Sequence, residues 1–118
     1  MFEYRATVLR VVDGDTVDLL IDLGFSISYT HSCRLFGINA PEHGTPEGDA
    51  ATAFHAKLLP AGAPVVVRTQ KDKFEKYGRI LGTVFLAKKD APQGTSINDQ
   101  LVAAGCAKPW DGRGARPV

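Results

Sequence analysis

Residues 4–23, YRATVLRVVDGDTVDLLIDL, contain two alternating segments separated by an Asp-Gly pair. From Tyr4 to Val12, apolar and polar residues alternate with the period of two expected of a strand that has one buried face. From Val17 to Leu23 the pattern repeats, and Gly24 ends the segment. Because Asp-Gly between two such segments is typical of a tight turn, the chain is predicted to begin with a β-hairpin.

Three further strands are predicted beyond the hairpin. The run from Phe25 to Ile38 is rich in β-branched and aromatic residues and ends at Asn39-Ala40-Pro41, where proline stops pairing, so we expect a third, curved strand. Ala63 to Thr69 and Arg79 to Leu86 are β-branched runs that predict strands four and five. A lysine-rich polar stretch, Gln70 to Gly78, separates them.

Two helices are predicted between and after these strands. Thr45-Pro46 supplies an N-cap and a first-turn proline, and Ala50, Phe54 and Leu58 follow at helical spacing. The segment from Ser96 to Gly105 begins with a capping-box pattern and ends with a C-cap glycine. A helix after strand three and another after strand five indicate a β-rich α+β protein, a five-stranded OB-fold barrel with two α-helices.

Length and composition favour one globular domain spanning residues 1–118. The net charge of +1 argues against strong non-specific binding to duplex DNA, so any affinity for a polyanion must be local. The segment from Met1 to Arg10 carries charges unlike a signal peptide, and no apolar run is long enough to span a bilayer. We expect a cytoplasmic monomer without a membrane partner. Cys33 and Cys106 have no metal-binding spacing and predict no disulfide framework.

Charged residues gather at the predicted strand ends. They are Asp13 and Asp15 in the first turn, Arg34 in strand three, Glu42 just after it and Arg79 at the start of strand five. Taken singly, each has an ordinary structural explanation, since Asp-Gly turns are common and a lone arginine in a strand is usually solvated. The sequence motifs that surround these residues favour a functional role instead.

Three linked motifs surround these residues: Val12-Asp13-Gly14-Asp15-Thr16-Val17, Arg34-Leu35-Phe36-Gly37-Ile38-Asn39-Ala40-Pro41-Glu42 and Lys76-Tyr77-Gly78-Arg79. In this order and spacing the sequence resembles the staphylococcal nuclease (thermonuclease) family, from about residue 5 to about residue 109. The resemblance implies a Ca²⁺-dependent endonuclease that hydrolyses phosphodiester bonds of DNA and RNA with little sequence preference.

The resemblance also implies a role for each matching residue. Asp15, Asn39, the Ala40 carbonyl and Glu42 would form the metal site, and Glu42 would also orient or deprotonate the attacking water. Arg34 and Arg79 would grip the scissile phosphate. The remaining pair, Lys76 with Tyr77, would hold a neighbouring phosphate.

The chemistry of phosphodiester hydrolysis requires a similar set of groups. Negative phosphate oxygens repel hydroxide, so a hard cation and fixed positive donors are needed where charge accumulates. Arginine binds phosphate through two parallel hydrogen bonds and keeps its charge. An all-oxygen ligand set favours Ca²⁺, or Mg²⁺, over zinc. The family most often has Asp where this chain has Asn39, which predicts a higher metal requirement or an altered Ca²⁺/Mg²⁺ preference.

Two other interpretations remain open from the sequence. One is a catalytically inactive OB-fold module that binds single-stranded nucleic acid, since barrels of this kind often bind single strands without cutting them. A structural or protein-interaction barrel would show no nucleic-acid affinity and no stabilisation by metal. Retention of Asp15, Arg34, Glu42 and Arg79 in register favours the enzyme.

Overall fold

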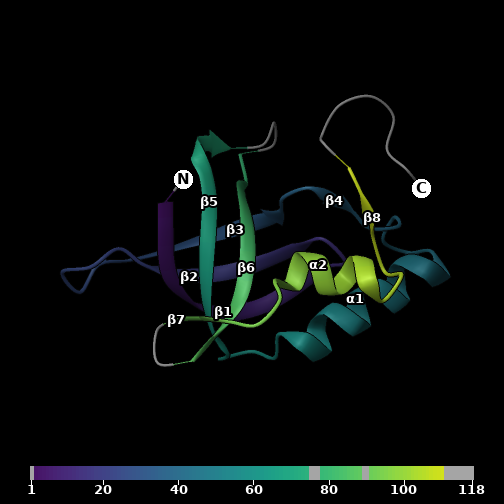
Figure 1. Cartoon of the computed structure of the whole chain (residues 1–118), viewed down its shortest axis with the longest axis horizontal. Helices are drawn as coiled ribbons and strands as arrows, with labels where there is room; N and C mark the ends of the chain where they lie inside the picture. The colour runs from purple at the N-terminus through teal and green to yellow at the C-terminus, as the bar shows by residue number, and fades with distance from the viewer. Residues whose placement is uncertain (1, 75–77, 89–90, 111–118) are drawn as a thin grey trace.

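The computed structural model describes residues 2–74, 78–88 and 91–110, with backbone alone for residues 71–74. In chain order the elements are β1 (Phe2–Asp13), β2 (Thr16–Asp22), β3 (Ser28–Leu35), β4 (Ile38–Asn39), α1 (Pro46–Leu58), β5 (Pro64–Phe74), β6 (Ile80–Lys88), β7 (Ala91–Gln93), α2 (Ile97–Ala103) and β8 (Lys108–Pro109) (Figure 1). The short strands β4, β7 and β8 were not predicted from the sequence.

The five long strands form a closed barrel in the order β3-β2-β1-β5-β6. Neighbours in this order pair antiparallel, and β3 closes the barrel by pairing in parallel with β6, Cys33 against Ile80 and Leu35 against Gly82. A Cβ on Gly82 would lie 2.7 Å from a Val67 methyl carbon, so glycine permits the close approach at this seam. The predicted OB-like barrel with two helices is confirmed.

Strand β1 is long enough to belong to two pairs. Its residues 6–13 pair with β2, and its residues 2–7 pair with β5. The pairing with β2 shifts between Val8 and Arg10 and again between Val11 and Asp13. Such irregularities bend a strand and increase its twist, which lets β1 curve around the barrel and deliver its end to the hairpin turn.

The predicted third strand, residues 25–38, is wrong as a single element. Residues 24–26 all have positive φ, including Phe25 at 54° and Ser26 at 60°, so they form the turn between β2 and β3. Pairing stops again after Leu35, and a second turn precedes β4. The run carries no proline or Asp-Gly pair at either break, and the signals present were the single glycines Gly24 and Gly37, which both have positive φ.

The boundaries of the last two barrel strands also differ from the prediction. Strand β5 continues to Phe74, so it includes half of the stretch predicted to separate the strands. Strand β6 begins at Ile80, which leaves Arg79 just outside the barrel strand. This position places the Arg79 side chain at the end of the β3–β6 seam.

Both helix N-caps are confirmed. Thr45 accepts a hydrogen bond from Gly48 N, and Ser96 accepts one from Asp99 N. The buried face of α1 differs from the predicted one: Ala50 is exposed, and Phe54 and Leu58 are half-buried. The buried residues of α1 are instead Gly48, Ala51 and His55, whose small or polar side chains allow the helix to approach two loops closely.

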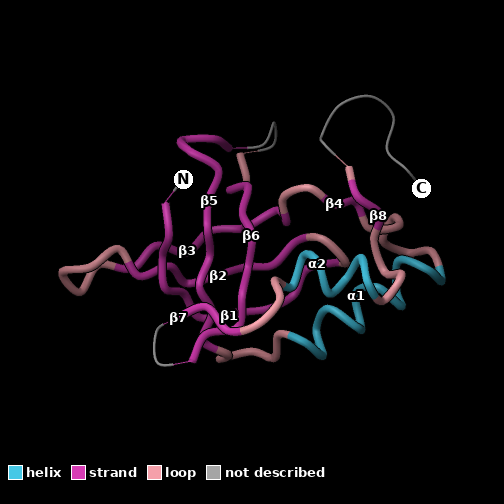
Figure 2. Tube along the Cα trace, in the orientation of Figure 1, coloured by secondary structure: helices cyan, strands magenta, loops and turns pink. Residues whose placement is uncertain are grey.

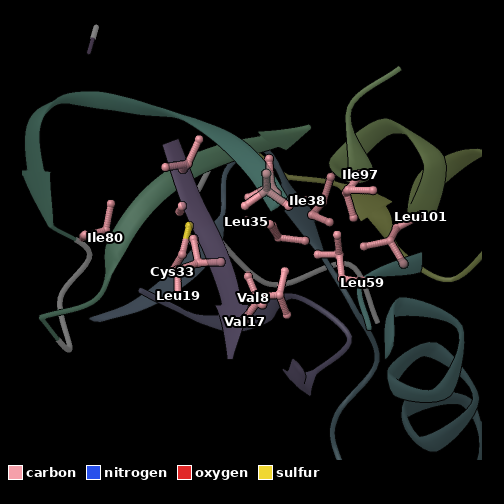
Figure 3. Packing of buried hydrophobic residues seen from close by; sticks show 14 of the residues in the cluster. Val8, Val17, Leu19, Cys33, Leu35, Ile38, Leu59, Ile80, Ile97 and Leu101 are labelled. Carbon is pink, nitrogen blue, oxygen red and sulfur yellow. The ribbon is translucent and has the colours of Figure 1, made fainter. Parts of the chain in front are cut away.

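The hydrophobic core joins the barrel interior to the helices. In Figure 3, Val8 and Val17 from the first hairpin lie near Leu59, while Ile97 and Leu101 come from α2. Each of these side chains is at most 1% exposed. Burial of such a side chain stabilises the fold by about 1.5–3 kcal/mol relative to exposure, so this packing fixes the helices against one end of the barrel.

Both helices lie on the same side of the barrel (Figure 2). The turn between β2 and β3 projects away from them at the opposite end of the molecule (Figure 1). Within the described residues, no helix has the length and apolar character needed to cross a membrane.

Candidate active site

The first hairpin turn places Asp15 at the barrel end. Asp13 pairs with Thr16, and the Asp13 Oδ1 atom accepts a hydrogen bond from Asp15 N at 3.0 Å. This bond from the backbone to an Asp side chain two residues earlier is a common way to fix a tight turn. The Asp15 side chain is consequently buried, with 8% of the residue exposed.

The loop after β4 brings Asn39 and Ala40 to the same place. Ala40 N donates a hydrogen bond to Asp15 Oδ2 at 3.0 Å, and Asn39 Nδ2 donates to Ala40 O at 3.2 Å. Strand β4 is held by pairing with β8, Asn39 against Lys108. These hydrogen bonds link three residues that carry oxygens of different kinds: a carboxylate in Asp15, a side-chain amide in Asn39 and a backbone carbonyl in Ala40.

Arg34 contacts the side-chain oxygens of both Asp15 and Asn39. It lies opposite Thr16 in the β2–β3 register and is only 6% exposed. Its Nη2 atom lies 3.4 Å from Asp15 Oδ2 and donates to Asn39 Oδ1 at 3.3 Å, while Nη1 donates to Leu35 O at 2.9 Å. The buried carboxylate and the buried guanidinium thus neutralise one another, as burial of either charge requires.

Arg79 reaches the same group from the barrel seam. Its Nη1 atom donates to Thr16 Oγ1 at 3.2 Å, and Thr16 Oγ1 donates to Asp15 Oδ1 at 3.3 Å. The structure therefore brings together five residues selected from the sequence: Asp15, Arg34, Asn39, Ala40 and Arg79.

The environment of Asp15 disfavours its negative charge. Burial raises the pKa of this carboxyl group above its ordinary value of 3.8, while the guanidinium of Arg34 opposes that shift. A carboxylate in this position is stabilised by any further positive partner that reaches its oxygens.

Helix α1 forms the back of the site. A Cβ on Gly14 would lie 2.6 Å from Ala40 Cβ and 2.9 Å from Ala51 Cβ, and one on Gly48 would overlap the Glu42 carbonyl. His55, fully buried, donates from Nδ1 to Asp13 O at 2.8 Å. Burial lowers the pKa of His55, so its neutral form is favoured. One helix therefore packs against both loops of the site.

Glu42 lies at the edge of this group. Its residue is exposed, and its backbone carbonyl accepts hydrogen bonds from Thr45 Oγ1 at 2.7 Å and from Thr45 N at 3.3 Å. Among the described residues its carboxylate has no hydrogen bond or ion pair, so the backbone is anchored while the side chain faces solvent. Lys76 and Tyr77 lie outside the described residues.

Three contributors to the site were missed by sequence reasoning. Thr16 connects Arg79 to Asp15, the centroid of the Trp110 ring lies 5.9 Å from the guanidinium carbon of Arg34, and His55 supports the first turn. For Thr16, the sequence offered a signal, because it directly follows Asp15 in the motif. The contacts of Trp110 and His55 depend on tertiary packing and have no local signal.

The donor set can be compared with the needs of a divalent cation. The described residues contain no group of three or more His, Cys, Asp or Glu side chains arranged around a common point. The hydrogen-bonded residues Asp15, Asn39 and Ala40 nevertheless carry one carboxylate, one amide oxygen and one backbone carbonyl, and such hard oxygens fit Ca²⁺ or Mg²⁺ better than zinc. They carry only one formal negative charge, which Arg34 already balances.

Comparisons with known proteins identify a matching family and several similar sequences. The family model described as "Staphylococcal nuclease homologue" matches residues 32–114. An uncharacterized endonuclease of Escherichia coli is 33% identical over 98% of this chain and 67% of its own length. Protein ParB of Escherichia coli is 34% identical over 98% of this chain and 63% of its length. A micrococcal nuclease of Shigella flexneri is 33% identical over 89% of this chain and 58% of its length.

Proposed function

Since the chain belongs to the staphylococcal nuclease family, we propose that it hydrolyses phosphodiester bonds of DNA and RNA with little sequence preference. We propose further that the reaction depends on a divalent cation, Ca²⁺ or alternatively Mg²⁺. The observation that carries this proposal is that hydrogen bonds and an ion pair join two arginines to Asp15, Asn39 and Ala40 at one end of the barrel. The chain spans 67%, 63% and 58% of the lengths of the three relatives, so the proposal concerns this chain and not the activity of any whole relative.

The two arginines supply the binding site for the scissile phosphate. Each is held by a neighbouring side chain, Arg34 by Asp15 and Arg79 by Thr16, so neither has to be ordered when substrate arrives. A guanidinium donates through a planar fork that matches phosphate oxygens. Charge that develops on these oxygens in the transition state is stabilised by donors already in place, which is often the largest contribution to catalysis.

Asp15, Asn39 and the Ala40 carbonyl would hold the cation. When bound, a hard divalent ion supplies charge neutralisation at the phosphate and lowers the pKa of water at its surface. The buried Asp15 carboxylate, whose pKa is raised by burial, gains most from such a partner. Asn39 contributes an oxygen without a charge, which weakens the attraction compared with a second carboxylate.

Glu42 is the proposed base. Glu42 lies two residues after Ala40, and its backbone is fixed by the hydrogen bond that its carbonyl accepts from Thr45. Its carboxylate is exposed to the solvent from which the attacking water comes. A carboxylate positioned to accept the water proton contributes typically about 10²- to 10⁴-fold to the rate.

The test is cleavage of single-stranded DNA, duplex DNA and RNA in Ca²⁺, in Mg²⁺ and in chelator. Glu42→Gln and Arg79→Ala are each expected to lower kcat by roughly 10²-fold or more. The matched controls are Glu47→Gln, an exposed glutamate in the first turn of α1, and Arg68→Ala, an arginine on β5 that pairs with Glu3. Both controls are expected to cut like the wild type.

Two results would contradict the proposal. Cutting that persists unchanged in chelator would remove the cation from the reaction. Binding of strands without cleavage in either metal would show a binding module instead, with the missing charge at Asn39 as the first explanation.

A further inference from the structure

The chain returns to the candidate active site after α2. Strand β8 pairs with β4, which places Lys108 opposite Asn39, and Trp110 N donates a hydrogen bond to Gly37 O at 2.8 Å. Lys108 precedes a proline, and this favours the extended backbone that the pairing requires. We call residues 108–110 the return segment.

The return segment brings the Trp110 ring to Arg34. The guanidinium carbon of Arg34 lies over this ring, 5.9 Å from its centroid. Trp110 is half-buried and Arg34 is only 6% exposed, so the contact is partly shielded from solvent. Since the attraction between a guanidinium and an indole face strengthens as water is removed, the ring is a further support for Arg34.

This contact differs in kind from the hydrogen bonds of Arg34. A guanidinium carries its five N–H donors in the plane of the group and none above it. Donors make the contacts with Leu35 O, Asn39 Oδ1 and Asp15 Oδ2, whereas a ring against the face uses none. Trp110 therefore restrains the guanidinium without taking up a group that a phosphate would bind.

The tilt of the guanidinium plane is the property that such a ring controls. Two parallel bonds to phosphate oxygens form only when the fork of donors and the oxygens are aligned. The contacts of Arg34 Nη2 are long, 3.3 Å to Asn39 and 3.4 Å to Asp15, against about 2.7–2.9 Å for a strong charged hydrogen bond. They hold the position of the group but restrain its tilt only loosely.

We propose that Trp110 is a positioning residue that sets the tilt of the Arg34 guanidinium for phosphate binding. This inference rests on the proposed nuclease function and adds to it a residue from outside the three sequence motifs. Trp110 acts through Arg34 and needs no contact with the substrate. The return segment thus orders two side chains of the site, Asn39 by backbone pairing and Arg34 by the ring.

The side-chain Nε–H resonance of Arg34 tests the contact without any cleavage. Protons over an indole face are shielded by its ring current, so Trp110→Leu in the full chain is expected to move this resonance to higher ppm. Trp110→Phe keeps an aromatic face and should move it less, and it serves alone if leucine prevents folding. Arg34→Lys assigns the resonance.

The backbone amide of Asn39 is the internal reference for this NMR experiment. The pairing of β8 with β4 uses main-chain atoms, so the Asn39 amide should move little when the Trp110 side chain changes. An Arg34 resonance that stays at its wild-type position in both Trp110 variants overturns the proposal, whether or not the protein cuts nucleic acid.

Kinetics distinguish positioning from a structural role. Trp110→Leu is expected to lower kcat roughly 5- to 30-fold with KM little changed, and Trp110→Phe is expected to lower kcat less. Phe85→Leu is the matched control, because the guanidinium carbon of Arg68 lies over the Phe85 ring, 4.9 Å from its centroid. It removes the same kind of contact outside the site and should leave kcat unchanged.

Two kinetic results would overturn the proposal for a wild type that cuts. If kcat falls only in step with the unfolding free energy measured in urea, equally in the Trp110 and Phe85 variants, the role of Trp110 is structural. If KM rises while kcat is kept, the ring binds the substrate itself. If the wild type cuts nothing in Ca²⁺ or Mg²⁺, the nuclease proposal fails, and the Arg34 resonance alone decides whether Trp110 positions Arg34.

Discussion

Replacing Gly14 by alanine is expected to damage both the stability and the activity of this protein. The added Cβ would lie 2.6 Å from Ala40 Cβ and 2.9 Å from Ala51 Cβ, against about 3.4 Å for an ordinary contact. Neither neighbour has a side-chain torsion through which it could move away, so the backbone of the turn, of the Ala40 loop or of α1 must shift. The added Cβ would be about 0.8 Å too close to Ala40 Cβ and about 0.5 Å too close to Ala51 Cβ.

Overpacking of this kind typically costs about 1–3 kcal/mol of unfolding free energy. The shift also separates Asp15 from Ala40, whose hydrogen bond joins the two loops of the site at 3.0 Å. Catalytic groups tolerate displacements of about 0.5 Å, and a 1 Å misplacement can cost about 10²-fold in rate. We therefore expect Gly14→Ala to lower kcat by roughly 10- to 100-fold.

Urea denaturation and initial rates of DNA cleavage measure the two effects of Gly14→Ala separately. Ala51→Gly in the same chain removes one of the two clashes and should recover part of the lost kcat, although the glycine itself costs about 1 kcal/mol of helix stability. A Gly14→Ala protein with the unfolding free energy and kcat of the wild type would refute the steric reasoning.

Three further predictions follow from the same contacts. Asn39→Asp is expected to lower the Ca²⁺ concentration at the midpoint of activity and to lower stability in chelator, because it adds a second buried carboxylate; an unchanged midpoint in a metal titration would count against a ligand role. His55, with its pKa lowered by burial, binds its proton less readily when folded than when unfolded, so stability should fall as pH drops below about 6.5; urea titrations from pH 8 to 5 should show this slope, and His55→Gln should reduce it. Burial raises the pKa of Cys33 to about 12, so iodoacetamide at pH 8 should label the half-buried Cys106 first and Cys33 only on unfolding; equal labelling rates in the folded protein would contradict the packing.

Local sequence patterns were sufficient to predict most of the barrel strands. Alternation around Asp13-Gly14 predicted the first hairpin, and Thr45 and Ser96 cap the helices as expected. The failures occur where the local signal is weak, such as the single glycine at each break in the third predicted strand. Phe25 adopts a positive φ that its side chain disfavours, and only the surrounding turn imposes that conformation.

The positions of the site residues were predictable, but their contacts were not. Strand ends and linked motifs indicated that Asp15, Arg34 and Arg79 would meet, and the structure brings them together. The sequence did not indicate that Arg34 would donate a hydrogen bond to Asn39, a proposed metal ligand, because that bond depends on how two loops pack against α1. For the same reason the apolar spacing of α1 pointed to Phe54, whereas the helix buries His55 more completely.

The parallel seam between β3 and β6 makes the pairing of the two arginines depend on a contact between distant segments of the chain. Cys33 and Ile80 are far apart in the chain, and contacts between distant segments form late because closing a long loop costs entropy. Arg34 belongs to one strand of the seam, and Arg79 directly precedes the other. In a chain whose β3 and β6 have not yet paired, the two arginines are not held together, and we expect no cleavage of nucleic acid. Under the proposed function, the time at which cleavage begins during refolding should therefore report when the barrel closes.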